Sequence, residues 1–292
     1  MLIWGSTWLA ITFQFGEVNP ILSVGLRFML AAIILGLYCF FKKLSLRLPS
    51  HIHFKMAAAG LCLYALDYTL LYHSQQYILS AIVAVMSSCM VYINVMLRRV
   101  LLKKPIRPEV LIGATCGLVG IALIFLPEFA KIKADHLLLI GIALAFTSFF
   151  FASLGNVVSE RILDHGTPVI QMNFWAMSYG VVFILAFALL QDVEWRLPTS
   201  PAYYASMLYL SLFGSVLAFG AYMKLVRQMG SDKSAYVVLV YPIVALILST
   251  LFEGYQWHLE AIIGVCVVLV GNGIAMGKIP LPGLTTSKNH QG

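Results

Sequence analysis

Long apolar runs separated by short charged connections constrain this chain more than any other feature of its sequence. Most of the runs approach the roughly 20 residues that a helix needs to cross a bilayer. Backbone groups in hydrocarbon must bond within their own segment, so the runs are expected to be helices. The sequence therefore predicts an all-α integral membrane protein with ten transmembrane helices. Their expected ranges are 2–15, 20–41, 54–74, 79–102, 110–126, 136–158, 168–190, 202–226, 234–252 and 258–277.

Composition agrees with lipid as the main solvent of the chain. The 292 residues are 61% hydrophobic and 11% charged, whereas a soluble domain is nearer half apolar and a quarter charged. The five cysteines all fall inside apolar runs, without a CxxC pair or a cluster of histidines. They are interpreted as small hydrophobic residues, and neither a metal site nor a cofactor is expected.

The positive charges predict the orientation of the helices, because cytoplasmic loops are enriched in Lys and Arg. With the N-terminus inside, only Lys131, Lys133 and Arg196 fall in outer loops, and Arg27 falls within a span. The other fifteen fall at the cytoplasmic side: Lys42, Lys43, Arg47, Lys55, Arg98, Arg99, Lys103, Lys104, Arg107, Arg161, Lys224, Arg227, Lys233, Lys278 and Lys288. Both termini are therefore expected in the cytoplasm. The net charge of +7 then needs no nucleic-acid partner.

The two ends of the chain differ from the rest. The run at 2–15 lacks the basic region and the small-residue cleavage site of a signal peptide. It is also short for a span, so an incomplete start is one expectation. Residues 279–292 are polar and are expected to form a disordered cytoplasmic tail.

An internal repeat is visible when the chain is shifted by 151 positions. Residues 109–120 read EVLIGATCGLVG and residues 260–271 read EAIIGVCVVLVG, with six of twelve positions identical. The alternative is a chance similarity between two apolar helices. A true repeat would divide the chain into 1–126 and 136–278, each with five helices. An odd number of helices inverts the second copy, which is an architecture of secondary transporters.

Several segments resemble EamA-type transporters of the drug/metabolite transporter superfamily. The first half carries IWGSTWLAI at 3–11, NPILSVGLRF at 19–28 and SQQY at 74–77. The second half carries GSDKSAYVVLVYPIVALILSTLFEG at 230–254 and HLEAIIGVCVVLVGNGIAM at 258–276. The chain departs from the family where Val91 replaces a frequent proline. The resemblance implies two inverted five-helix repeats and transport of metabolites, often export, through a central cavity.

Two ionisable residues lie inside predicted spans and are candidates for function, because charges in a bilayer are unfavourable. Arg27 is seven residues from Pro20, and Asp67 is seven residues from Ser74, so both lie about 10 Å below the outer face. Equal depth predicts an ion pair between them. One interpretation is a structural pair. The other is that Arg27 binds a substrate carboxylate, or that Asp67 carries a coupling proton.

Aromatic and polar residues inside the spans are expected to face the interior of the bundle. Together with Arg27 and Asp67, they form the predicted substrate cavity: Trp4, Ser6, Trp8, Tyr64, Tyr68, Tyr92, Asn156, Ser215, Tyr222, Tyr236 and Tyr241. For each residue, the alternative is a structural place in the interior. Pro242 interrupts the run at 234–252 and is interpreted as a hinge, with a static kink as the alternative.

The motifs that would indicate other activities are missing from the sequence. There is no GxxxxGK[ST] loop for ATP, and no GxSxG or HExxH arrangement for catalysis, so an enzyme is not expected. The expected function is a secondary transporter of the cytoplasmic (inner) membrane that exports small metabolites, with amino acids or related compounds as the expected cargo. An importer and a non-transport membrane protein are the alternatives. Expected partners are the substrate, the lipid bilayer and protons as a candidate coupling ion, in a monomer or a weak dimer.

Overall fold

The computed structural model describes residues 2–14, 18–74, 76–78, 83, 86–129, 136–196, 198–252 and 257–280. Within these ranges, every regular element is a helix. Five helical stretches have the length and composition to cross a membrane: Pro20–Phe41, Ser50–Leu71, His136–Asp164, Val169–Leu190 and Pro201–Met229. Pro108–Ile124 and Leu259–Ala275 are shorter apolar helices. The fold is therefore that of an all-helical, multi-pass membrane protein.

The helical elements follow one another closely along the chain. In the first half they are α1 (Leu2–Thr12), α2 (Pro20–Phe41), α3 (Ser50–Gly60), η1 (Leu61–Leu66), α4 (Asp67–Ser74), α6 (Cys89–Leu102), α7 (Pro108–Ile124) and α8 (Leu126–Phe129). In the second half they are α9 (His136–Asp164), α10 (Val169–Leu190), α11 (Pro201–Tyr209), η2 (Leu210–Leu217), α12 (Ala218–Met229), α13 (Ser231–Ser234), α14 (Tyr236–Phe252) and α15 (Leu259–Ala275).

Local sequence explains where several helices begin. Pro20 opens α2, where its fixed φ and missing N–H suit the first turn. The Asn19 side chain accepts a hydrogen bond from the Ile21 backbone N–H at 2.9 Å, which caps the same turn. Ser200 and Pro201 repeat this arrangement at the start of α11.

The helix ends agree with the apolar runs in some places and differ in others. Helix α2 covers the same residues as the run at 20–41. Helix α9 continues beyond the run at 136–158 to Asp164, because its last turns are buried against other helices and not against lipid. For the run at 79–102, the structure describes a continuous helix only from Cys89, and most of the preceding residues lie outside the described ranges.

Two π-helical segments interrupt otherwise α-helical spans. Segment η1 lies between α3 and α4, and η2 lies between α11 and α12. Shifted by 151 positions, residues 61–66 become 212–217, which fall inside η2. Segments with i→i+5 hydrogen bonds are rare and are frequent at functional sites. Nothing in the sequence analysis predicted them.

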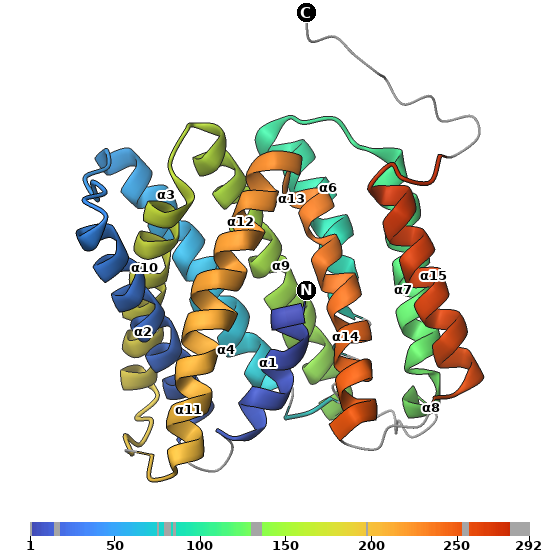
Figure 1. The fold of residues 1–292 in the computed structure, drawn as a ribbon, viewed down its shortest axis with the longest axis horizontal. Coiled ribbons are helices and arrows are strands. Elements are labelled where there is room, and N and C mark those ends of the chain that lie inside the picture. The colour runs from blue at the N-terminus through green and yellow to red at the C-terminus, as the bar shows by residue number, and fades with distance from the viewer. Residues whose placement is uncertain are drawn as a thin grey trace, which may run out of the picture.

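Close helix pairs stand at the two ends of the bundle in Figure 1, with α7 and α15 at one end and α2 and α10 at the other. Glycine lets α7 and α15 approach closely. A Cβ added to Gly120 would lie 2.6 Å from the carbonyl oxygen of Gly264, and one added to Gly271 would lie 2.7 Å from that of Gly113. The two helices run antiparallel (Figure 1). Small residues at such contacts let the backbones of the two helices touch directly.

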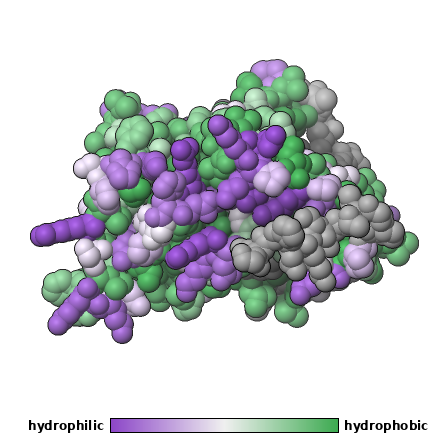
Figure 2. All heavy atoms as spheres, turned by 90° about the horizontal axis from the view of Figure 1, so that it is seen from above, coloured by the Kyte–Doolittle hydropathy of each residue, from purple (hydrophilic) through white to green (hydrophobic). Residues whose placement is uncertain are grey.

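One face of the bundle collects the basic connections. The turns between α2 and α3, α6 and α7, α9 and α10, and α12 and α13 all lie at the upper end in Figure 1, together with the end of α15. Figure 2 views this face from above and shows hydrophilic side chains over its centre, with many hydrophobic and some hydrophilic side chains toward its rim. This face, called the basic face below, is the one that carries the residues of the predicted cytoplasmic loops.

Candidate functional site

Arg27 is a buried cation within the span of α2, and the residue is 4% exposed. Its Nε donates a hydrogen bond to Ser215 Oγ on η2 at 2.9 Å. Its Cζ lies 5.4 Å from the ring centroid of Phe28 and 5.9 Å from that of Tyr68. The Nη1 and Nη2 groups make no hydrogen bond or ion pair with any residue that the structure describes. Among the described residues, the guanidinium is therefore held by one hydroxyl and two aromatic faces, and no carboxylate pairs with it.

Gly214 makes room for this guanidinium. A Cβ at this position would lie 3.0 Å from Arg27 Nη2 and 3.0 Å from Thr7 Cγ2. The Gly214 carbonyl accepts a hydrogen bond from Trp4 Nε1 at 3.1 Å. The backbone of η2 thus passes close to Arg27 on one side and is held by α1 on the other.

Aromatic rings from both halves of the chain pack together next to Arg27. Phe28 contacts Tyr64 at 4.7 Å, and Trp4 contacts Phe219 at 5.2 Å, both between ring centroids. These contacts extend to six residues, called the aromatic group below: Trp4, Phe28, Tyr64, Tyr68, Phe219 and Tyr222. The hydroxyls of Tyr64 and Tyr222 are buried and have no hydrogen-bond partner among the described residues.

The expected ion pair between Arg27 and Asp67 is not formed, although the structure describes both residues. Asp67 Oδ1 accepts a hydrogen bond from Ser148 Oγ on α9 at 2.6 Å, whereas Arg27 donates to Ser215 on η2. Depth along two helices was the basis of the expectation, and depth does not determine which neighbouring helix each side chain faces. Each charge has instead found a hydroxyl on a different helix of the second half.

Two of the predicted residues, Ser215 and Tyr68, contact Arg27 directly. Three more, Trp4, Tyr64 and Tyr222, belong to the aromatic group beside it. Three others have partners elsewhere. Ser6 shares a hydrogen bond with the Tyr209 hydroxyl at 2.6 Å, and Tyr92 shares one with Thr115 at 2.8 Å. Tyr236 donates to the Val110 carbonyl.

The remaining predicted residues are less defined. Asn156 is buried on α9, and its Oδ1 has no partner among the described residues. Trp8, Tyr241 and the predicted hinge Pro242 belong to described helices, but their side chains lie outside the described part. A pocket of about 640 Å³ lies where α12 ends and α10 begins. Its lining residues include Gln171, Lys224 and Arg227, and none of the predicted site residues.

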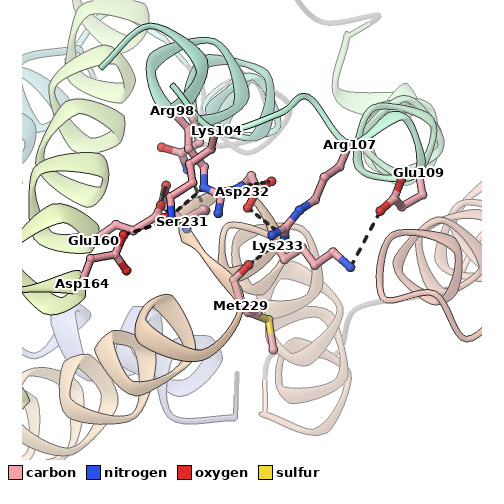
Figure 3. Close-up of polar contacts among 11 residues, drawn as sticks. Arg98, Lys104, Arg107, Glu109, Glu160, Asp164, Met229, Ser231, Asp232 and Lys233 are labelled. Carbon is pink, nitrogen blue, oxygen red and sulfur yellow. Dashed lines mark hydrogen bonds and ion pairs between the residues drawn. The ribbon is translucent and has the colours of Figure 1, made fainter. Parts of the chain in front are cut away.

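A second group of charges is buried at the basic face (Figure 3). Arg98 on α6 places Nε 2.8 Å from Glu160 Oε1 on α9 and Nη1 3.1 Å from Asp232 Oδ2 on α13. The side chains of Arg98, Glu160 and Asp232 are only 6%, 3% and 2% exposed. One arginine of the first half is thus enclosed between two carboxylates of the second half.

Further contacts make this group a charge-balanced network. Glu160 Oε2 accepts hydrogen bonds from Ser231 N at 2.8 Å and from Ser231 Oγ at 2.7 Å. Arg107 Nη1 lies 3.5 Å from Asp232 Oδ1 and donates to the Met229 carbonyl at 2.8 Å. Two cations therefore face two anions, and the contacts join α6, α9 and the α12–α13 turn. Figure 3 also shows the more exposed pairs Lys104–Asp164 and Lys233–Glu109 at its edge.

Gly230 permits the turn that carries Ser231 and Asp232. Its φ of 90° and ψ of 162° lie in a region that only glycine populates readily. A Cβ here would also lie 2.6 Å from Arg98 Nη2 and 2.9 Å from Asp232 Oδ1. The backbone conformation of the GSDKS segment at 230–234, with no Cβ at Gly230, therefore leaves room for the Arg98 side chain.

This network was not predicted from the sequence. Arg98 and Arg107 were counted as loop charges, and Glu160 and Asp232 were given no role. A usable signal was present, because the whole chain has only 12 acidic residues. Two of these, Glu160 and Asp232, lie at helix ends among basic residues. The enrichment of cytoplasmic loops in Lys and Arg does not explain acidic residues at these positions.

The fold and these buried charges define a polytopic membrane protein, and sequence comparison gives its family. The profile of the EamA-like transporter family matches residues 1–126 and 139–276. The chain therefore belongs to the EamA-like transporter family.

Similar proteins cover nearly the whole chain. An uncharacterized transporter of Bacillus subtilis, YoaV, is 26% identical over 275 residues, 92% of this chain and 91% of that protein. An uncharacterized inner membrane transporter of Escherichia coli K12, YedA, is 28% identical, with 96% of this chain and 90% of that protein covered. One solved crystal structure has the same fold, with a TM-score of 0.80 at 15% identity, covering 95% of this chain and 93% of the other.

Proposed function

We propose that this protein is a secondary transporter that exports small metabolites across the cytoplasmic (inner) membrane by alternating access. The observation that carries the proposal is the network of Arg98, Glu160 and Asp232. It joins the two halves of the chain at the basic face, while Arg27 lies about 10 Å from the opposite end of α2. A path from Arg27 to the basic face is then closed by contacts that can break as a unit.

The proposed architecture is ten transmembrane helices in two inverted five-helix repeats, 1–126 and 136–278, with both termini and the 279–292 tail in the cytoplasm. Three observations support it. The family profile matches the chain twice. The π-helical segments occupy corresponding positions. Gly113 faces Gly271 while Gly120 faces Gly264, and a shift of 151 converts 113 into 264 and 120 into 271. Reciprocal contacts of this kind are expected between two copies related by a two-fold axis.

The cargo is proposed to be an amino acid or a related metabolite. An Escherichia coli K12 relative with the name "Probable amino-acid metabolite efflux pump" is 19% identical and covers 93% of this chain and 90% of that protein. The aromatic group and its unpaired tyrosine hydroxyls suit a small cargo with apolar and polar parts. The cytoplasmic membrane as location agrees with the name of YedA as an inner membrane transporter.

Counterflow in proteoliposomes tests the function without knowledge of the coupling ion. Vesicles preloaded with pooled amino acids, nucleosides, sugars or cationic compounds would be exposed to a labelled member of the same pool. We expect accumulation of at least one label, absent from protein-free vesicles. Folded protein that exchanges no member of any pool would contradict the proposed function. Net efflux from right-side-out and inside-out vesicles would then establish the direction.

A further inference from the structure

We propose that Arg27 binds the carboxylate of the cargo, and that the cargo is a small organic acid with an apolar or aromatic body. This inference deepens the proposed function and rests on it. The protein would leave Arg27 without a counter-ion so that the transported acid supplies one.

The charge of Arg27 is isolated from the described carboxylates. Arg27 is 4% exposed inside an apolar span, where an unpaired cation is strongly unfavourable. The described carboxylate inside a neighbouring span, Asp67, is bonded to Ser148 instead. A purely structural arginine would be expected to hold a carboxylate, as Arg98 does in the same protein. A buried arginine that pairs with none of the described carboxylates supports a site that a ligand completes.

The guanidinium keeps donors that the described contacts do not use. Of the five N–H groups of a guanidinium, the described contacts use only the one on Nε, which donates to Ser215. The four N–H groups on Nη1 and Nη2 remain for a ligand. Nη2 lies above Gly214, where a larger residue would displace it. A planar fork of parallel N–H groups matches the two oxygens of a carboxylate.

The aromatic group bears on the rest of the cargo. Phe28 and Tyr68 lie against the guanidinium, and the other members of the aromatic group continue from them. Aromatic rings of this kind favour an apolar or aromatic body. The unpartnered hydroxyls of Tyr64 and Tyr222 add polar groups that could bond an amine or a hydroxyl of the cargo. Aromatic and branched amino, keto and hydroxy acids have this combination.

The test uses acids and their amides, which differ in charge but have nearly the same shape. Thermal unfolding of the full-length protein in detergent would be followed with phenylacetate and phenylacetamide, L-phenylalanine and L-phenylalaninamide, and isovalerate and isovaleramide. In the wild type, at least one acid should raise Tm more than its amide. In Arg27→Gln the difference should vanish, with the affinity for that acid about 10- to 100-fold weaker. Arg27→Lys should give an intermediate affinity, because it keeps the charge and loses the fork.

A matched control separates the site from general electrostatics. Arg227→Gln makes the same substitution on an exposed arginine of the basic face, and it should keep the preference for the acid. Without ligand, Arg27→Gln should unfold at a Tm no lower than that of the wild type, because an unpaired buried charge is removed. A clear loss of stability would indicate a structural role and overturn the inference.

Three further results would overturn it: no difference between acid and amide in any pair, a difference that persists in Arg27→Gln, or an equal loss in Arg227→Gln. Counterflow distinguishes this failure from failure of the proposed function. Wild-type exchange that Arg27→Gln leaves unchanged would retain the transporter and remove the carboxylate site. Acid-dependent stabilisation without any exchange by folded protein would retain the binding site and remove the transporter.

Discussion

Replacing Glu160 by glutamine tests whether the buried network holds the basic face closed. Glu160 contributes an ion pair to Arg98 at 2.8 Å and accepts two hydrogen bonds from Ser231. Removing one partner of a buried pair costs about 3–5 kcal/mol. Arg98 keeps Asp232 at 3.1 Å, and glutamine keeps one oxygen for Ser231, so we expect the lower value, about 3 kcal/mol. This loss of stabilisation applies only while the ion pairs are formed and water is excluded from them.

If the basic face opens during transport, water reaches these groups and the loss disappears. The variant would then shift the ratio of closed to open protein by roughly 100-fold toward the open form, since 1.36 kcal/mol corresponds to a factor of ten. Asn156 lies one turn before Glu160 on α9 and is 2% exposed. A cysteine introduced there, with the five native cysteines replaced by alanine, should report the opening. Its alkylation by a membrane-impermeant reagent in inside-out vesicles should be at least about 10-fold faster with Glu160→Gln.

Asp164→Asn is the matched control on the same helix. Asp164 pairs with Lys104 at 3.3 Å, but both side chains are about 40% exposed, and surface pairs contribute about 0–1 kcal/mol. The alkylation rate should therefore stay close to that of the wild type. Equal rates in Glu160→Gln and Asp164→Asn, in protein that remains folded, would refute the reasoning. A lower Tm for Glu160→Gln without faster alkylation would mean that the network stabilises a single arrangement.

Four more outcomes are expected. Gly230→Ala should lower the free energy of unfolding by about 1–3 kcal/mol, because φ is 90° and the added Cβ would meet Arg98. Gly220→Ala, within α12 and with nothing within 4 Å of the added Cβ, should not lower stability in the same detergent melts. Gly120→Val should weaken the α7–α15 contact by about 1–3 kcal/mol, also read from thermal unfolding, because the added Cβ would lie 2.6 Å from the Gly264 carbonyl oxygen. Exchange of acid for acid should exceed net efflux in the wild type, because the empty carrier must reorient with Arg27 unpaired, and Arg27→Gln should reduce this excess in vesicle flux measurements.

The helices could be predicted from the sequence because lipid imposes simple demands on a chain. Apolar side chains and internal backbone bonding were enough to place α2 at its observed bounds. The same demands do not separate α-helix from π-helix, since both satisfy the backbone internally. Segments η1 and η2 contain ordinary apolar residues and no proline. That these segments include Tyr64 and Ser215 therefore became visible only in the structure.

The site was partly predictable for a related reason. A charge inside an apolar run stands out, so Arg27 and Asp67 were found as candidates, and sequence distance gave their depth. Sequence spacing does not show how each helix is rotated about its own axis. It also does not show which helix of the second half faces each side chain. These decided that Ser215 and Ser148 are the partners. The expectation of an ion pair used depth alone and was wrong for that reason.

The network at the basic face was missed because its charges lie at helix ends, where charged residues are common in any membrane protein. Arg98, Glu160 and Asp232 are far apart in sequence, with separations of 62 and 134 residues between Arg98 and its two partners. Only the fold brings α6, α9 and α13 together. Their near-complete burial then distinguishes them from nearby pairs such as Lys104–Asp164.

The two buried arginines, Arg98 and Arg27, thus have opposite kinds of partner. Arg98 has two carboxylates within 3.1 Å and forms a network that is neutral with Arg107 included. Arg27 has one serine and two aromatic faces. A neutral network can open and close without ligand, because its charges satisfy one another when dry and water satisfies them when open. A guanidinium without a carboxylate in a dry site is further stabilised when an anion arrives. This difference is what a carrier needs, since closure must be reversible while the binding site must respond to its cargo.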